Sequence, residues 1–278
     1  MKFLTSVDSL HQLLEDKEPV VVIDARFDLG DATYGKRVYE EGHIPGAVHL
    51  DLKDDLSGEV KKHGGSHPLP PIEAFVEKLS SIGIDHETTV VVYDDANDMY
   101  AARAWWMIHY VGHEHVYVLD GGFKRWKEAG YQVTTETPTL IPKQFTPRPL
   151  DIVVHMEEVK EKMNDSSAIL IDSRARERYL GKTEPLYKKS GHIPGAKNFF
   201  WKDVLNEDGF WKSVKELQEH FSSLRKNEEI IVSCGSGVSA CPNFIGLTLA
   251  GYDNVKLYPG SFSDWISYEE NTLETKEE

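Results

Sequence analysis

Short apolar runs rich in β-branched residues recur along the chain and alternate with amphipathic stretches. In the first half, residues 20–23, 90–93 and 116–119 predict buried strands, and residues 72–79 and 100–110 predict helices. Unbroken apolar strands that alternate with helices are typical of a parallel sheet covered by helices on both faces. The pattern of the first half therefore predicts an α/β domain.

The second half of the chain shows the same alternation. Its expected strands cover residues 169–171, 230–232 and 255–258, and its expected helices cover residues 155–163, 214–221 and 240–250. The predicted fold class is accordingly α/β, with two domains that each contain a mainly parallel sheet and helices on both faces.

The two halves also share four sequence landmarks in the same order, at offsets of about 139 to 149 positions. The landmarks are VVVIDAR at 20–26 and AILIDSR at 168–174, GHIPGA at 42–47 and 191–196, VVVYD at 90–94 and IIVSC at 230–234, and DGGF at 120–123 and PGSF at 259–262. Such a long period predicts a duplicated domain and not a solenoid. The third landmark aligns Asp94 with Cys234.

A proline-rich segment separates the two copies. Residues 134–149, TTETPTLIPKQFTPRP, contain four prolines and no periodic apolar pattern, which is typical of an extended linker. We therefore expect a first domain at residues 1–135, a linker at 136–150 and a second domain at 151–278.

Composition and charge restrict the partners. Hydrophobic residues make up 40% of the 278 residues and the formal net charge is −15, which argues against nucleic acid or an anionic membrane as the main partner. The N-terminal residues lack the apolar core of a signal peptide, and no segment has the length of a membrane span, so the sequence as given predicts a cytoplasmic protein. The two cysteines, Cys234 and Cys241, are too few for a disulfide scaffold.

Cys234 lies where chemistry is expected in an α/β domain, directly after a predicted strand and before a glycine-containing loop and a helix. Backbone N–H groups of such a loop, together with the helix N-terminus, can stabilise a thiolate or a persulfide anion. The alternative is a buried and inert cysteine. Cys241 lies on the apolar helix that follows, where a core role is favoured, although the spacing leaves a Cys234–Cys241 redox pair open.

The chain at this point closely resembles the rhodanese family, in particular the tandem-domain thiosulfate and 3-mercaptopyruvate sulfurtransferases. The resemblance rests on the duplicated Asp-x-Arg and Gly-His-Ile-Pro-Gly-Ala motifs, the loop from Cys234 to Ser239, and Asp94 at the cysteine position of the first copy. It implies an inactive first domain and a second domain in which Cys234 is the catalytic nucleophile. Ser236 would assist catalysis, and the loop residues Gly235, Gly237, Val238 and Ser239 would bind the substrate.

The resemblance also suggests how an anionic sulfur donor is held. Arg178 matches a family arginine that contacts the anionic end of the substrate, with a surface salt bridge as the alternative role. A second family arginine is unmatched, and only Lys188 is near its place. His67 matches a family histidine proposed to act with the loop serine. The loop has no Arg or Lys, so it resembles the 3-mercaptopyruvate branch more than the thiosulfate branch.

The predicted function is therefore a sulfurtransferase that moves a sulfane sulfur from 3-mercaptopyruvate or thiosulfate through a Cys234 persulfide. The acceptor would be cyanide or a thiol, with a thioredoxin-like protein as one candidate, and neither a metal nor an organic cofactor is expected. His113 and His115 could suggest a metal site, but no third ligand is evident in the sequence.

Three other functions compete with this prediction. A non-catalytic persulfide carrier or interaction module for a protein partner fits the same loop. A cysteine phosphatase would need an arginine six positions after the nucleophile, where this chain has Ala240. A cysteine protease using His67 has no supporting local motif.

Overall fold

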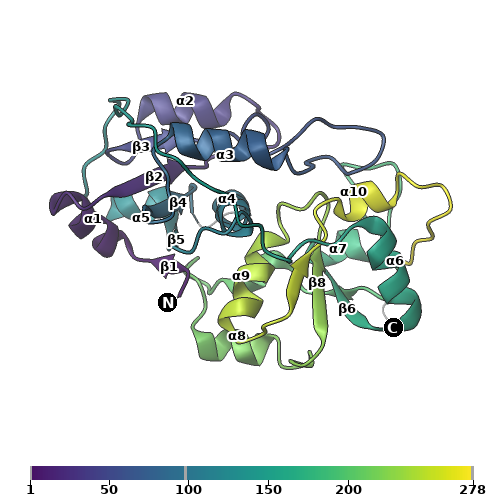
Figure 1. The fold of residues 1–278 in the computed structure, drawn as a ribbon. Helices are drawn as coiled ribbons and strands as arrows, with labels where there is room; N and C mark the ends of the chain where they lie inside the picture. The colour runs from purple at the N-terminus through teal and green to yellow at the C-terminus, as the bar shows by residue number, and fades with distance from the viewer. Residues whose placement is uncertain (1, 97–98, 277–278) are drawn as a thin grey trace. The chain divides into compact units, whose positions relative to one another are not determined.

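The computed structural model describes residues 2–96 and 99–276, and the chain divides into two compact units. The first unit comprises Met1–Gly58, Pro70–Leu150 and Glu207–Trp211, and the second comprises Glu59–Leu69, Asp151–Asn206 and Lys212–Glu278. Each unit has its own parallel sheet with helices packed around it (Figure 1). The predicted fold class, α/β with two domains, is thus confirmed.

The sheet of the first unit has five strands in the order β1-β5-β4-β2-β3, all parallel. The elements of this unit are β1 (Leu4–Thr5), α1 (Val7–Glu15), β2 (Val20–Asp24), α2 (Tyr34–Glu41), β3 (Ala47–His49), α3 (Ile72–Ser81), β4 (Thr89–Tyr93), α4 (Met99–Tyr110), β5 (Val116–Leu119) and α5 (Gly122–Glu128).

Both faces of this sheet are buried, as the unbroken apolar strands predict. Val91 and Tyr93 of β4 pack in one cluster with Leu10 of α1 and Trp126 of α5. Val92 points to the opposite face because side chains alternate along a strand, and it is fully buried as well. The helix α4 packs against β4 and β5.

The sheet of the second unit has four strands in the order β7-β6-β8-β9, again all parallel. The elements of this unit are α6 (Met156–Asp165), β6 (Ala168–Asp172), α7 (Arg176–Tyr179), β7 (Lys197–Asn198), the 3-10 helix η1 (Trp201–Val204), α8 (Val214–His220), β8 (Glu229–Ser233), α9 (Cys241–Leu249), β9 (Val255–Leu257) and α10 (Ser261–Trp265).

Figure 1 shows α8 and α9 on one side of β6 and β8, and α6, α7 and α10 on the other. Leu170 and Ile231 pack on the second of these sides, in a cluster with Val159 of α6 and Trp265 of α10. Val232 alternates with Ile231 along β8 and is also fully buried. The two buried faces fix the register of β8, and with it the position of the residue that follows this strand.

Residues 136–150 contain neither helix nor strand and belong to the first unit. Their backbone is held there by the N–H of Arg148, which donates to the Val111 carbonyl at 2.8 Å, and by the N–H of Leu150, which donates to the Tyr110 carbonyl at 2.9 Å. Proline lacks the N–H donor that a continuous ladder requires, which explains the irregular backbone. The domain limits 1–135, 136–150 and 151–278 stay predictions.

The helices are short. The longest helix in the described part of the chain, α4, has 12 residues, whereas a bilayer-spanning helix needs about 20 apolar residues. None of the helices described could therefore span a membrane.

Candidate active site

Cys234 follows the last residue of β8, at the carboxyl edge of the second sheet. Its neighbour in the sheet is β6, which ends at Asp172 opposite Ser233. The next helix, α9, begins at Cys241, so residues 234–240 form the predicted loop between strand and helix. Parallel strands bring their following loops together at this edge, which is where open α/β sheets bind ligands.

The sulfur of Cys234 accepts a hydrogen bond from a backbone amide. Residue Cys234 is 1% exposed, and its Sγ lies 3.1 Å from the N–H of Gly237. Gly237 has φ +76°, and a Cβ at this position would collide with the carbonyl oxygen of Pro259. The loop therefore needs glycine here, both for its left-handed backbone and for the close approach. An amide donor at this distance favours a negatively charged sulfur.

Ser261, the first residue of α10, supports the same cysteine. Its hydroxyl accepts a hydrogen bond from the N–H of Cys234 at 3.0 Å and lies 4.0 Å from Sγ. It donates to the carbonyl of Tyr258 at 2.7 Å. Ser261 is fully buried and has φ +51°, a conformation that costs a residue with a Cβ about 1–2 kcal/mol. The sequence marked this turn as a repeated landmark but did not predict a role for the serine.

His67 and Ser236 are in contact, as the family resemblance implies. The Nδ1 of His67 lies 2.8 Å from the hydroxyl oxygen of Ser236. His67 belongs to Glu59–Leu69, a segment of the second unit. The same segment is held next to α10 by the N–H of Gly64, which donates to Asp264 at 2.6 Å, and by the N–H of Ser66, which donates to Ser263 at 3.0 Å.

Arg178 lies near the loop and is also part of a buried ionic network. Its Nη2 is 3.6 Å from the point where a Cβ on Gly235 would stand. Its Nε and Nη2 donate to the carboxylate of Glu184 at 2.8–3.1 Å. Glu184 also pairs with Arg174 at 3.2 Å, and Arg174 pairs with Asp172 at 2.6 Å. The two guanidinium groups are thus matched by two carboxylates.

The residue that approaches the loop near the expected Lys188 is Tyr187. The Tyr187 hydroxyl oxygen is 3.1 Å from the point where a Cβ on Gly235 would stand. Lys188 itself is exposed, and no hydrogen bond or ion pair between it and residues 234–240 occurs in the described structure. A tyrosine carries no charge that would have marked it as an anion ligand, so sequence reasoning missed it.

A family model confirms what these motifs suggest. The model of the rhodanese-like domain matches residues 6–129 and 155–268, which is most of the chain. The chain belongs to the rhodanese family.

Similar proteins include enzymes named for both donors of this family. A probable 3-mercaptopyruvate sulfurtransferase of Pseudomonas aeruginosa is 41% identical over 254 residues, which is 89% of each chain. A thiosulfate sulfurtransferase of Cricetulus griseus is 36% identical over 257 residues, 88% of this chain and 84% of its own. The structure of SseA from Escherichia coli, described as a 3-mercaptopyruvate sulfotransferase, has a TM-score of 0.84 at 32% identity and covers 95% of this chain and 100% of its own. The prediction of a sulfurtransferase is confirmed at this level.

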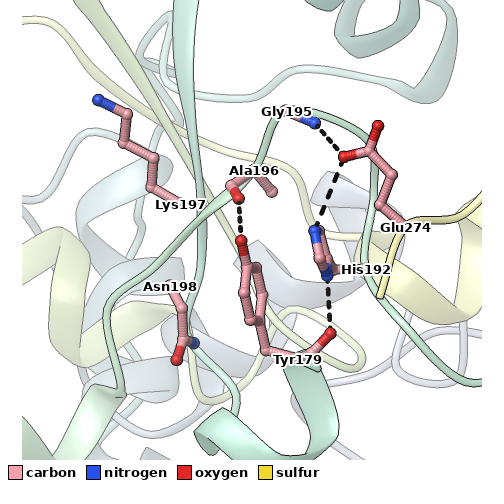
Figure 2. Close-up of a pocket in the computed structure, with 7 residues that line it drawn as sticks. All are labelled: Tyr179, His192, Gly195, Ala196, Lys197, Asn198 and Glu274. Atoms are coloured by element: carbon pink, nitrogen blue, oxygen red, sulfur yellow. Dashed lines mark hydrogen bonds and ion pairs between the residues drawn. The ribbon is translucent and has the colours of Figure 1, made fainter. Parts of the chain in front are cut away.

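The second Gly-His-Ile-Pro-Gly-Ala motif of this rhodanese chain forms a turn around a buried histidine, and Figure 2 shows its contacts. The ring of His192 stacks on Tyr179 with centroids 3.7 Å apart, and its Nδ1 donates to the Tyr179 carbonyl at 2.7 Å. The Tyr179 hydroxyl donates to the carbonyl of Ala196 at 2.7 Å, and Gly195 N–H donates to Glu274 at 3.2 Å. These bonds fix the path of the backbone into β7.

Cys241 is fully buried at the start of α9, as expected for a core residue. Its thiol donates to the carbonyl of Gly237 at 3.4 Å. The other two loop residues that the resemblance implicates differ in exposure: Val238 is buried and Ser239 is half-buried. Gly237 contacts both cysteines, because its N–H donates to the Cys234 sulfur and its carbonyl accepts from the Cys241 thiol.

Within residues 2–96 and 99–276, no three His, Cys, Asp or Glu side chains are grouped as they would be around a metal ion. The ring centroids of His113 and His115 are 6.3 Å apart, in the first unit.

Proposed function

We propose that Cys234 accepts a sulfane sulfur from a small anionic donor, forms a persulfide, and passes the sulfur to a thiol or to cyanide. The observation that carries the proposal is the hydrogen bond from Gly237 N–H to the Cys234 Sγ at 3.1 Å, at the carboxyl end of β8. A thiolate and a persulfide both carry negative sulfur, so the same amide serves both states of a two-step reaction.

In the first step, the Cys234 thiolate attacks the transferable sulfur of the donor. A sulfur–sulfur bond forms, and the bond from that sulfur to the donor breaks. The electron pair leaves with pyruvate as its enolate, or with sulfite when thiosulfate is the donor. Arg178, whose Nη2 reaches the space above Gly235, is suited to hold the anionic end of the donor.

In the second step, an acceptor thiolate or cyanide attacks the outer sulfur. The sulfur–sulfur bond breaks, the new persulfide or thiocyanate leaves, and Cys234 returns to its thiolate. A thioredoxin-like protein would supply such a thiolate, as would a small thiol. Both steps balance without a metal, a redox cofactor or an external oxidant.

The charge of the site favours 3-mercaptopyruvate over thiosulfate. Arg174 and Arg178 are matched by Asp172 and Glu184 before any donor arrives. The loop from residue 234 to residue 240 contains no cationic side chain. A dianion gains more than a monoanion from uncompensated positive charge, so this site suits the monoanionic carboxylate of 3-mercaptopyruvate.

Intact-protein mass spectrometry after exposure to each donor tests the proposal. We expect a gain of one sulfur atom that maps to residue 234 and is removed by cyanide or a thiol. Cys234→Ser should show neither the mass gain nor turnover, whereas the matched control Cys241→Ser should keep both. Loss of both in each variant would contradict a single nucleophile, and loading without repeated turnover would indicate a persulfide carrier.

A further inference from the structure

The Tyr187 side chain lies beside Gly235, the residue that follows the cysteine. The cysteine is followed by Gly235, and the point where a side chain would begin on this glycine is 3.1 Å from the Tyr187 hydroxyl oxygen and 3.4 Å from its ring carbon Cε2. Arg178 Nη2 is 3.6 Å from the same point. A phenol and a guanidinium therefore border the space beside Cys234 that glycine leaves open.

The Tyr187 hydroxyl lies near three serines, Ser66, Ser236 and Ser263, whose side chains act to lower the pKa of its phenol. Ser236 in turn contacts His67 Nδ1 at 2.8 Å. Burial raises the pKa of the Tyr187 phenol, and negative charge at Cys234 raises it further. The phenol is therefore a neutral proton donor at neutral pH, whichever way its neighbours are protonated.

The two donors differ in what their leaving groups need. When sulfur leaves 3-mercaptopyruvate, the electron pair remains on an enolate, and the proton of the donor's thiol must move to carbon to give pyruvate. When sulfur leaves thiosulfate, sulfite departs as a stable anion and takes no proton. A neutral hydroxyl aimed at the leaving group thus assists the first reaction and gives the second little.

We propose that Tyr187 determines the donor specificity of this site by donating its phenolic hydrogen bond to the enolate oxygen as pyruvate leaves. This inference rests on the proposed function of Cys234 and names the donor class for it. Tyr187 thus places a neutral hydrogen-bond donor beside Gly235, where added positive charge would favour a dianion. Lys188, which is exposed, does not take this part.

Tyr187→Phe removes the hydroxyl and keeps the ring. We expect kcat with 3-mercaptopyruvate to fall about 10²-fold with little change in KM, as for removal of one donor to a developing oxyanion. The rate with thiosulfate should stay within about twofold of the wild-type rate. The variant keeps the interactions that bind the ground state and the transition state equally. The matched control is Tyr179→Phe, which removes a hydroxyl bonded to the Ala196 carbonyl and should leave the ratio of the two donors unchanged.

Tyr187→Arg tests the same position in the opposite direction. The added cation should raise kcat/KM for thiosulfate about tenfold and lower it for 3-mercaptopyruvate. Equal losses with both donors in Tyr187→Phe, or an unchanged donor ratio in both variants, would overturn the assignment. Mass spectrometry of sulfur loading at residue 234 in each variant separates a failure of the Tyr187 proposal from a failure of the Cys234 proposal. If the variants load normally but keep the wild-type donor ratio, only the role of Tyr187 fails, whereas absence of loading in the wild type removes the function of Cys234 as well.

Discussion

The ends of β4 and β8 share one backbone frame, in which two carbonyls after the strand accept hydrogen bonds from the first turn of a helix. The side chains at the two ends differ. At the end of β8, the carbonyls of Cys234 and Gly235 accept hydrogen bonds from Phe262 and Ser263 at 3.0 and 2.9 Å. At the end of β4, the carbonyls of Asp94 and Asp95 accept hydrogen bonds from Phe123 and Lys124 at 2.8 Å each.

The side chains at the two strand ends differ in what they can do. The sulfur of Cys234 accepts a hydrogen bond from the Gly237 amide. Asp94 is equally buried, and its carboxylate accepts from the N–H of Ala101 in α4 at 2.8 Å. In the first unit the group at the strand end stabilises its own fold, whereas in the second unit a matching frame holds the sulfur that we propose as the nucleophile. The frame is therefore common to both units, and the residue that it holds differs.

The largest expected effect concerns the buried Asp-x-Arg pair that each unit contains. In the first unit Asp24 pairs with Arg26 at 2.6 Å, and in the second Asp172 pairs with Arg174 at the same distance. Removing one partner of a buried pair leaves an uncompensated charge, which costs about 3–5 kcal/mol. We expect Asp24→Ala to lower the free energy of unfolding by this amount. Asp172→Ala should cost less, because Arg174 keeps Glu184 as a second carboxylate.

Hydrogen exchange of the amides in β2 and β6 measures the two effects in separate units of one protein. The control is Lys36→Ala, which removes an exposed i,i+4 pair with Glu40 and should change neither. An equal loss in β2 and β6 would show that Glu184 does not compensate Arg174.

Gly112 follows α4 and Gly251 follows α9, and the residue after each of these glycines distinguishes the units by pH. In the first unit this residue is His113, whereas the second unit has Tyr252, whose hydroxyl donates to the carbonyl of Phe221 at 2.6 Å. Burial lowers the pKa of His113 from 6.5 to about 4. A lowered pKa means that the unfolded chain binds a proton first, so the stabilisation is complete above pH about 6.5 and is lost as pH falls toward 4.

We expect the first unit to lose about 3 kcal/mol across this window, as 1.36 kcal/mol per pKa unit requires. His113→Phe should remove most of this pH dependence in hydrogen exchange of β5. The matched variant Tyr252→Phe should leave the pH profile of β9 unchanged. A β5 profile that is the same with and without the histidine would refute the role of His113.

Much of the fold was predictable because its signals are local. The β-branched runs mark the strands at residues 90–93 and 230–232, and their repetition marks two copies of one domain. Cys234 could be placed because the strand, the glycines and the helix are consecutive in the sequence. The short elements α2 and α7 were not predicted, because a few residues carry too little periodicity to distinguish a helix from a loop.

The rest of the site depends on contacts between distant segments, which the sequence pattern does not encode. His67 reaches Ser236 of the loop from a segment that precedes it by about 170 positions, and Ser66 of the same segment reaches Ser263 of α10. Tyr187 lies one residue from the predicted Lys188, and only the packing decides which of the two faces Gly235. A salt bridge was the alternative role for Arg178, but its partner Glu184 was not predicted, although both residues lie in a segment that the family resemblance had marked.

The smallest expected effect concerns the turn at the start of α10 and its counterpart at the start of α5. Ser261 occupies a left-handed conformation, with φ +51°, where the first copy has Gly122 with φ +59°. Ser261→Ala removes the hydroxyl that accepts from Cys234 N–H, and this should slow sulfur transfer about fivefold for a hydrogen bond of about 1 kcal/mol. Ser261→Gly should slow it equally. It should also be the more stable of the two by about 0.5–1 kcal/mol, because glycine relieves the left-handed strain at some cost in unfolded-state entropy.

The reciprocal change, Gly122→Ser, should destabilise the first unit by about 1–3 kcal/mol, because overpacking against backbone cannot relax easily. A Cβ at Gly122 would lie 2.6 Å from the carbonyl oxygen of Asp94. Sulfur transfer measures the first pair of variants, and hydrogen exchange of β4 and β8 measures the stability of each. If Ser261→Ala transfers sulfur at the wild-type rate, the hydroxyl of Ser261 only stabilises the backbone, and the left-handed conformation does not contribute to sulfur transfer. If Gly122→Ser is tolerated without loss, the two turns are interchangeable, and the difference between the copies then lies in Cys234 and the loop that follows it.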